Sequence, residues 1–210
     1  MLMGSIQITD MRRRSDATVV VDVTVCGGGQ SEKLTFAFLS ELYDAAELCP
    51  GEISADVLCD IEFWANVTDA FNSACRSIAF APSSYRALSA KLLSKGFAKN
   101  VAEQAIELVK RRGYVKEGEI AQRRAEILLS KLWGQTRIIN KLYEEGFRDD
   151  ALEEVYLFLE GVDMAEQCAA LIEKRYGDVP EDKSKRDKLA AALYRYGYSP
   201  SEIRTAFLKF

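Results

Sequence analysis

The sequence predicts a mainly α-helical protein, in which tandem three-helix repeats form an elongated array behind a small N-terminal β-hairpin region. One helix ending occurs three times, as KLLSKGF at 91–97, KLYEEGF at 141–147 and ALYRYGY at 192–198. The glycines of these endings are 50 and 51 residues apart. A period of this length is typical of helical repeats that stack on their neighbours. Two segments within the first forty residues instead carry apolar side chains at every second position, which indicates strands.

Each repeated ending has the composition of a helix stop. Glycine at the C′ position adopts the left-handed backbone conformation without a Cβ penalty, and the next residue packs back on the helix in a Schellman arrangement. The expected contacts join Leu92 to Phe97, Leu142 to Phe147 and Leu193 to Tyr198. Two further helices are expected to end in the same way, at Gly113-Tyr114 and at Gly161-Val162.

Each repeat is expected to contain one helix before the repeated ending and one after it. The segments that follow the endings align without gaps and carry one apolar stripe at helical spacing: 98–109, 148–159 and 199–210. The leading helices are expected near 66–80, 118–132 and 163–175. The resulting three-helix repeats span 54–114, 115–162 and 163–210. Because so small a unit buries its apolar stripe poorly, we expect neighbouring units to stack.

The N-terminal region, 1–53, is predicted to contain strands and a short helix. TVVVDVTV at 18–25 places four valines on one face, and KLTFAF at 33–38 repeats the alternation. The glycine-rich residues between them are turn material, so the two segments predict a β-hairpin. SIQIT is expected to add a third strand. Ser40 is expected to cap a short helix that runs to Leu48.

The composition argues against several kinds of chemistry. The chain has no histidine, which excludes Ser-His-Asp and Cys-His catalysis and histidine-containing metal sites. Its five cysteines form no C-x-x-C pair, and no phosphate-binding glycine loop is present. We therefore expect no enzyme activity, no cofactor and no metal. No apolar run is long enough to span a membrane, so we expect a cytoplasmic monomer without a membrane partner.

The charge is distributed unevenly along the chain. Net charge is −8 over residues 1–69, +7 over 70–147 and −3 over 148–210. A basic middle segment suggests a polyanion or an acidic protein surface as partner. The candidate partner-binding residues are Lys110, Arg111, Arg112, Lys116, Arg123, Arg124, Lys131 and Arg137. A solvated helix face or a helix C-terminus explains each of them equally well without a partner.

Three further residues have competing interpretations. Trp133 precedes a glycine at the end of a helix and could anchor an interface, but a core position is the preferred interpretation. Asp149 and Asp150 could be read as paired catalytic carboxylates. We expect them instead in the first turn of a helix, where acidic side chains offset the helix dipole.

The segments SSYRALSAKLLSKGFAKNVAEQAIELVKRRGY, GQTRIINKLYEEGF and RYGYSPSEIRTAFLKF together resemble the RecX family of bacterial recombination regulators. The resemblance covers roughly residues 5–210 and is strongest over 82–160. It rests on the ordered set of three L-x-x-x-G-aromatic helices. The chain departs from the family pattern at Ser83-Ser84 and at 115–117, where the family often has an Arg-Ser pair and an acidic pair.

The resemblance implies a protein that binds the RecA recombinase filament on single-stranded DNA and lowers its ATPase, strand-exchange and coprotease activities. Such a protein would regulate DNA repair and recombination without being an enzyme. Two alternatives stay open at this point. One is a helical protein that binds DNA directly, with weak salt-dependent contacts from the basic middle. The other is a helical-repeat scaffold for a different partner.

Overall fold

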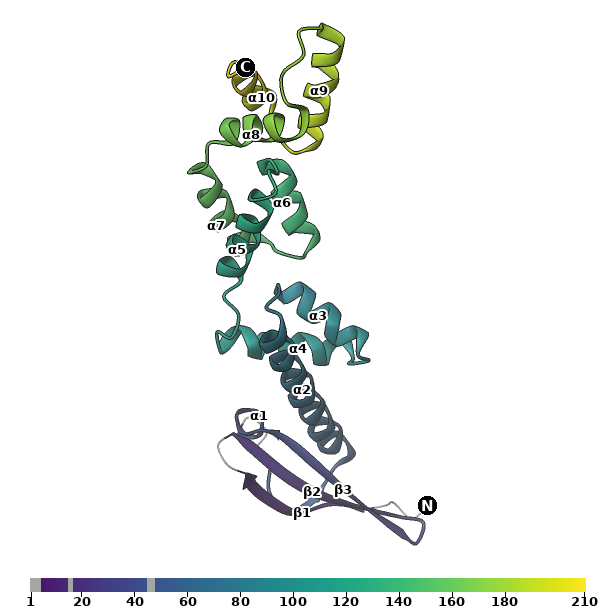
Figure 1. Ribbon diagram of the computed structural model, residues 1–210. Helices are drawn as coiled ribbons and strands as arrows, with labels where there is room; N and C mark the ends of the chain where they lie inside the picture. The colour runs from purple at the N-terminus through teal and green to yellow at the C-terminus, as the bar shows by residue number, and fades with distance from the viewer. Residues whose placement is uncertain (1–4, 15–16, 45–47) are drawn as a thin grey trace. The chain divides into compact units, whose positions relative to one another are not determined.

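The computed structural model describes residues 5–14, 17–44 and 48–210 (Figure 1). The chain divides into two compact units. The first unit consists of residues 1–81 with 88–114, and the second of residues 82–87 with 115–210. The structure confirms a mainly helical fold with an N-terminal β region.

The N-terminal region forms a four-stranded antiparallel sheet with the order β3-β2-β1-β4. Its strands are β1 (Ser5–Arg14), β2 (Thr18–Gly27), β3 (Gln30–Leu39) and β4 (Gly51–Ile53). The predicted hairpin joins β2 to β3 through Gly28 and Gly29, whose φ angles of 60° and 82° suit a two-residue turn. The SIQIT segment is confirmed as a strand and is longer than predicted, while β4 was not predicted.

The core of the first unit lies between this sheet and a long helix, α2 (Ala55–Phe80), which packs on β3 and on α4 (Lys99–Arg111). Ser54 caps α2 by accepting a hydrogen bond from the Val57 backbone N–H. The helix begins there rather than near residue 66, so the first leading helix is much longer than predicted. Helix α1 (Ser40–Asp44) starts at Ser40 as predicted, but residues 45–47 of its predicted length lie outside the described residues.

The remaining helices agree with the predicted pattern. In the first unit, α3 (Tyr85–Ser94) precedes α4, and the first turn of α3 belongs to the second unit. The second unit continues with α5 (Glu117–Leu129), α6 (Gln135–Glu144), α7 (Asp149–Glu160), α8 (Met164–Tyr176), α9 (Lys183–Arg195) and α10 (Pro200–Phe207). We call α5–α7 the second trio and α8–α10 the third trio. Asp149 and Asp150 lie in the first turn of α7, as expected.

Four of the five predicted helix endings are Schellman motifs. At each repeated ending the aromatic N–H donates to the carbonyl five residues back, as in Phe147 to Leu142 (3.1 Å) and Tyr198 to Leu193 (3.3 Å). Gly113 ends α4 in the same way. The prediction for Gly161 is wrong: its φ is −77° and the Val162 N–H donates to Leu159. The next helix begins at once after its Asp163 cap, so the chain needs no left-handed residue there.

Each trio of the second unit has its own apolar core. In the second trio the core includes Leu128, Ile138, Leu142, Phe147, Val155 and Leu159, and Trp133 packs against it as a partly buried residue. In the third trio it includes Cys168, Ile172, Leu189, Leu193, Tyr198 and Ile203. The core interpretation of Trp133 is therefore confirmed in part. Burial raises the pKa of the Cys168 thiol to about 12, so this thiol is protonated at neutral pH.

Candidate partner-binding surface

The eight predicted basic residues are divided between the two units. Lys110, Arg111 and Arg112 end α4 in the first unit. The other five lie in the second unit, on or beside α5 and α6: Lys116, Arg123, Arg124, Lys131 and Arg137. Each group is therefore considered by itself.

In the first unit, the end of α4 is tied to other parts of the unit. The Arg112 guanidinium lies over the Phe71 ring, 4.9 Å from its centroid, and pairs with Glu41 at 2.7 Å. Arg111 approaches the same carboxylate at 3.4 Å. The Tyr114 ring packs 5.9 Å from Phe71, centroid to centroid. Arg112 thus joins α4 to α1 and α2, and its charge is already compensated.

In the second unit, three of the five residues also have partners within the chain. Arg124 forms a bidentate pair with Glu145, with N–O distances of 2.7 and 2.9 Å, and its hydrogen bonds to that carboxylate raise the pKa of the guanidinium. Lys116 pairs with Glu119 at 2.8 Å. The Arg137 guanidinium lies 3.8 Å from the centre of the Trp133 ring and 5.0 Å from that of Tyr196. The contacts of Arg124 and Arg137 join different helices of the unit, whereas the Lys116 pair lies within the first turn of α5.

Arg123 and Lys131 differ from the other residues of the set. Both side chains are exposed, and neither has a hydrogen bond or an ion pair within the part of the chain that the structure describes. They lie on α5 and just after its end. They are accordingly the predicted residues best placed to meet a partner.

The second unit also contains two joints, at which the start of one helix meets a repeated glycine. At the first joint, the Ser84 hydroxyl donates to the Glu145 carbonyl oxygen at 2.8 Å, beside Gly146. At the second joint, the Gly134 N–H donates to the Tyr196 carbonyl oxygen at 2.9 Å, beside Gly197. Sequence reasoning missed both joints. A signal existed, since Ser84 and Gly134 each lie 12 residues before a repeated glycine.

The second joint opens onto a groove of about 800 Å³. Its aromatic and charged lining residues are Trp133, Arg137, Lys141, Glu144, Tyr194, Arg195 and the largely buried Tyr198. Tyr194 is 64% exposed, and the Arg195 side chain is exposed without a partner among the described residues. Three cations face one carboxylate here, so the groove carries a positive excess. It is a second candidate surface, and only Arg137 of the predicted set belongs to it.

Comparison with known proteins finds similarity to regulatory proteins named RecX. A family model described as "RecX, third three-helix domain" matches residues 162–207. The regulatory protein RecX of Clostridium perfringens is 26% identical over 200 residues, which cover 92% of this chain and 88% of that protein. The regulatory protein RecX of Halorhodospira halophila is 28% identical over 136 residues, which cover 64% of this chain and 84% of that protein. These matches support a protein of the RecX family of regulatory proteins.

Solved structures support the same fold. The crystal structure of a regulatory protein RecX superposes with a TM-score of 0.71 at 13% identity, covering 96% of this chain and 98% of that one. RecX from Lactobacillus salivarius superposes with a TM-score of 0.59 at 17% identity, covering 69% of this chain and 96% of that one. At these identities the likeness concerns the fold alone.

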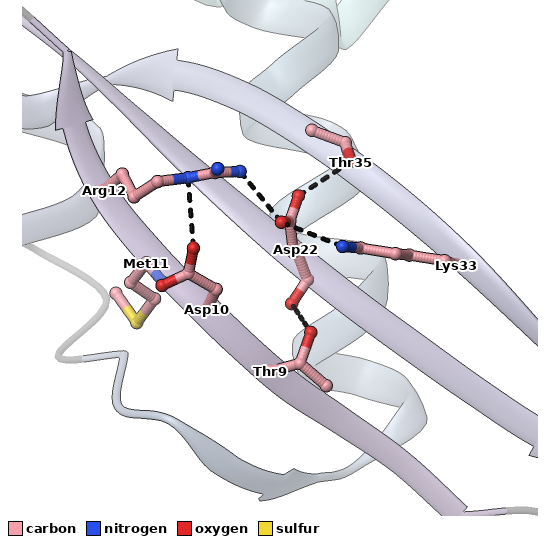
Figure 2. Close-up of polar contacts among 7 residues, drawn as sticks. All are labelled: Thr9, Asp10, Met11, Arg12, Asp22, Lys33 and Thr35. Atoms are coloured by element: carbon pink, nitrogen blue, oxygen red, sulfur yellow. Dashed lines mark hydrogen bonds and ion pairs between the residues drawn. The ribbon is translucent and has the colours of Figure 1, made fainter.

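The N-terminal sheet carries a polar network that sequence reasoning missed (Figure 2). Asp22 on β2 is only 4% exposed. Its carboxylate accepts hydrogen bonds from Thr35 and Arg12, both at 2.8 Å, and pairs with Lys33 at 3.3 Å. These contacts, the Thr35 bond first, lower the pKa of Asp22. Asp22 lies on the face of β2 opposite the four valines, and its neighbours on β1 and β3 cover it.

The described residues contain neither a candidate metal-ligand cluster nor a helix suited to span a membrane. No group of three or more Cys, Asp or Glu side chains there could hold a metal ion. No described helix is long and apolar enough to cross a membrane. The candidate surfaces are therefore the exposed basic residues of α5 and the groove at the second joint.

Proposed function

We propose that this protein binds the RecA recombinase filament on single-stranded DNA and lowers its ATPase, strand-exchange and coprotease activities. The observation that carries the proposal is the match to proteins named regulatory protein RecX, one of which aligns over 92% of the chain. The repeated helices and their exposed basic side chains support the same function, because a multi-helix surface can contact several protomers of a filament. The protein would act by binding alone, without a cofactor.

Arg123 and Lys131 are proposed as direct contacts to acidic groups of the filament or to DNA phosphates. Their charges are exposed and uncompensated among the described residues, so a partner meets them without first breaking an internal ion pair. Arg112 and Arg124 would instead act through the fold, because each already pairs with a carboxylate. These four residues thus separate into two contacting and two supporting residues.

The function is tested by adding the protein to RecA of the same organism on single-stranded DNA and following ATP hydrolysis at fixed salt. A fall in rate at substoichiometric amounts is expected, because one protein that blocks filament growth affects many protomers. A fall only when the protein matches the number of DNA sites would indicate that it sequesters DNA, which is the direct DNA-binding alternative. No effect on active RecA would contradict the proposal.

The contact residues are tested with the double variant Arg123→Glu/Lys131→Glu. We expect it to need about tenfold more protein for half-maximal inhibition, since two charge pairs become repulsive. The matched control is Lys174→Glu/Lys188→Glu, which reverses two exposed lysines of the third trio that have no partner in the described chain. Equal inhibition by the two double variants would show that α5 is not the contact surface.

A further inference from the structure

We propose that the groove at the second joint binds an acidic peptide segment of a protein partner, with the Arg137 guanidinium receiving a carboxylate. The inference deepens the proposed function. It rests on that function in one respect, namely that the partner is a protein. It commits to a chemistry of recognition, namely an Asp or Glu side chain with an apolar or aromatic neighbour. The groove has the size of a site for a few side chains, at about 800 Å³.

Arg137 has the features of a prepared anion site. Its planar guanidinium is held between Trp133 and Tyr196 at 3.8 and 5.0 Å from the ring centres. Stacking of this kind fixes the plane of the group but uses none of its five N–H donors. The side chain makes no hydrogen bond or ion pair within the described parts of the chain. Because the group is already ordered, little conformational entropy is lost when a carboxylate binds it in bidentate fashion.

The rest of the groove complements a carboxylate with an apolar neighbour. Arg195 supplies a second cation, which has no partner among the residues that the structure describes. Lys141 is paired with Glu144 at 3.1 Å, so the single lining carboxylate is already compensated. The exposed Tyr194 ring offers an apolar surface that a hydrophobic side chain of the peptide can cover.

The same features disfavour single-stranded nucleic acid as the occupant. Proteins bind single strands through several free aromatic faces on which bases stack, together with a continuous cationic track. Here Arg137 covers one face of Trp133, and both Arg137 and Arg175 lie over the Tyr196 ring. Among the aromatic lining residues that the structure describes, Tyr194 is the exposed one, since Trp133 is partly buried and Tyr198 is buried.

Arg148 provides a matched control for Arg137. It also stacks on an aromatic ring of the second unit, with its guanidinium 3.3 Å from the centre of the Tyr143 ring. Its donors, however, bond the carbonyl oxygens of Tyr143 and Phe147 at 2.6 and 2.5 Å, and it does not line the groove. A variant at Arg148 therefore removes a stacked cation without touching the proposed site.

The test measures binding of a fluorescein-labelled peptide that alternates Asp and Glu with Leu and Phe, by fluorescence anisotropy with the full chain. We expect saturable binding that weakens with salt, and no binding of the same peptide with Asn and Gln in place of its acids. R137Q should weaken binding about tenfold, as for the loss of one charged bidentate pair. R148Q should bind like the wild type. R137K, which keeps the charge without the planar fork, should also bind more weakly.

Several outcomes would overturn the inference: no binding of the acidic peptide by the wild type, equal effects of R137Q and R148Q, or preferential binding of a labelled oligothymidylate that R137Q abolishes. If R137Q unfolds, binding of the Asn/Gln peptide by the wild type and binding of the acidic peptide by R137K still test whether Arg137 receives a carboxylate. The RecA assay separates this inference from the proposed function. If R137Q loses peptide binding but the wild-type protein has no effect on RecA, the acidic-peptide site is supported and the proposed function is refuted.

Discussion

The two joints of the second unit occupy equivalent positions in the repeat but are built differently. At the first joint a side chain makes the contact, since the Ser84 hydroxyl bonds the Glu145 carbonyl oxygen. At the second joint two backbones meet directly, because Gly134 has no side chain to separate them. A Cβ on Gly134 would lie 2.3 Å from the Gly197 carbonyl carbon. The repeat therefore fixes which two segments meet at each joint, while one small residue sets how closely their backbones approach.

The two joints also differ in the residue that precedes the repeated glycine and in how an arginine holds that residue. Glu145 at the first joint is held by Arg124 through an ion pair. Tyr196 at the second joint is held by Arg175, whose guanidinium lies 5.2 Å from the ring centre and which donates to the hydroxyl. Arg124 and Arg175 each lie 22 residues before a repeated glycine. An arginine on the leading helix thus serves both joints with different chemistry.

Gly197→Ala should have the largest effect on the second joint. The φ of Gly197 is 96°, which disfavours a side chain, and an added Cβ would lie 2.5 Å from the Arg137 backbone nitrogen. Left-handed strain of about 1–2 kcal/mol and overpacking of about 1–3 kcal/mol predict a loss of about 3 kcal/mol in the free energy of unfolding. Urea unfolding measures it by Trp133 emission in a Trp64→Phe background, where Trp133 is the one tryptophan left of two.

Gly177→Ala is the control for that experiment. Gly177 ends α8 with φ 81°, but an added Cβ would meet nothing within 4 Å. The free energy of unfolding of Gly177→Ala should therefore fall only by the left-handed backbone strain, about 1–2 kcal/mol. Equal losses in the two variants would mean that close backbone approach contributes nothing at the second joint.

Gly134→Ala should have the next largest effect, and it isolates the close approach. The φ of Gly134 is −74°, which any residue adopts, so its loss comes from overpacking alone, about 2 kcal/mol. Gly161→Ala is the matched control, with φ −77° and only an ordinary contact at 3.5 Å. That variant should be neutral or slightly stabilising. Thermal unfolding of both variants would contradict the comparison if Gly134→Ala were as stable as Gly161→Ala.

The sequence predicted the elements of these joints but not the joints themselves. Glycine followed by an aromatic residue has a local cause, because the left-handed residue and the apolar contact lie within one helix end. Gly161 shows the limit of that rule, since the same residue type ends a helix without left-handed backbone when another helix cap follows at once. The strands could be predicted for the same reason, because the period of two in the valines of β2 is a local feature of the sequence.

Partners of charged side chains could not be read from the sequence, because they depend on how distant elements pack. Arg112 reaches Glu41 from 71 positions away, and Arg124 reaches Glu145 across 21. Both were candidates for partner binding on charge alone. The burial of Asp22 likewise depends on Arg12 and Lys33 of the neighbouring strands. Charge density in the sequence therefore located a basic segment but did not separate exposed cations from internally paired ones.

Alkaline pH should weaken the second joint more than the first. Burial raises the pKa of Tyr198 above its ordinary value of 10.0, whereas Phe147 at the equivalent place in the first joint cannot ionise. Because the folded pKa is the higher one, the contribution of Tyr198 is complete below pH 10 and falls as pH rises toward the folded pKa. The loss is about 1.4 kcal/mol per pH unit in that range. Urea unfolding at pH 10 and 11 measures it.

Tyr198→Phe separates this effect from other ionisations. The variant loses the hydrogen bond from the Tyr198 hydroxyl to the Leu132 carbonyl oxygen, so it should start about 1 kcal/mol less stable at neutral pH. Between pH 10 and 11 its stability should fall less steeply than that of the wild type. The fall that remains comes in part from Cys168, whose pKa burial raises to about 12. Parallel curves for the two proteins would remove Tyr198 as the titrating group.

The smallest expected difference is in the salt dependence of the two arginine contacts. A double-mutant cycle of Arg124→Met and Glu145→Gln should give a coupling energy of about 0.5–1 kcal/mol, because the pair is bidentate but partly exposed. Roughly 1 M salt shortens the screening length to about 3 Å, so the coupling should fall by about half. The equivalent cycle of Arg175→Met and Tyr196→Phe involves a neutral partner and should change little. If both couplings respond to salt alike, Arg175 is held by charge and not by the Tyr196 ring, and the two joints differ only in how closely their backbones approach.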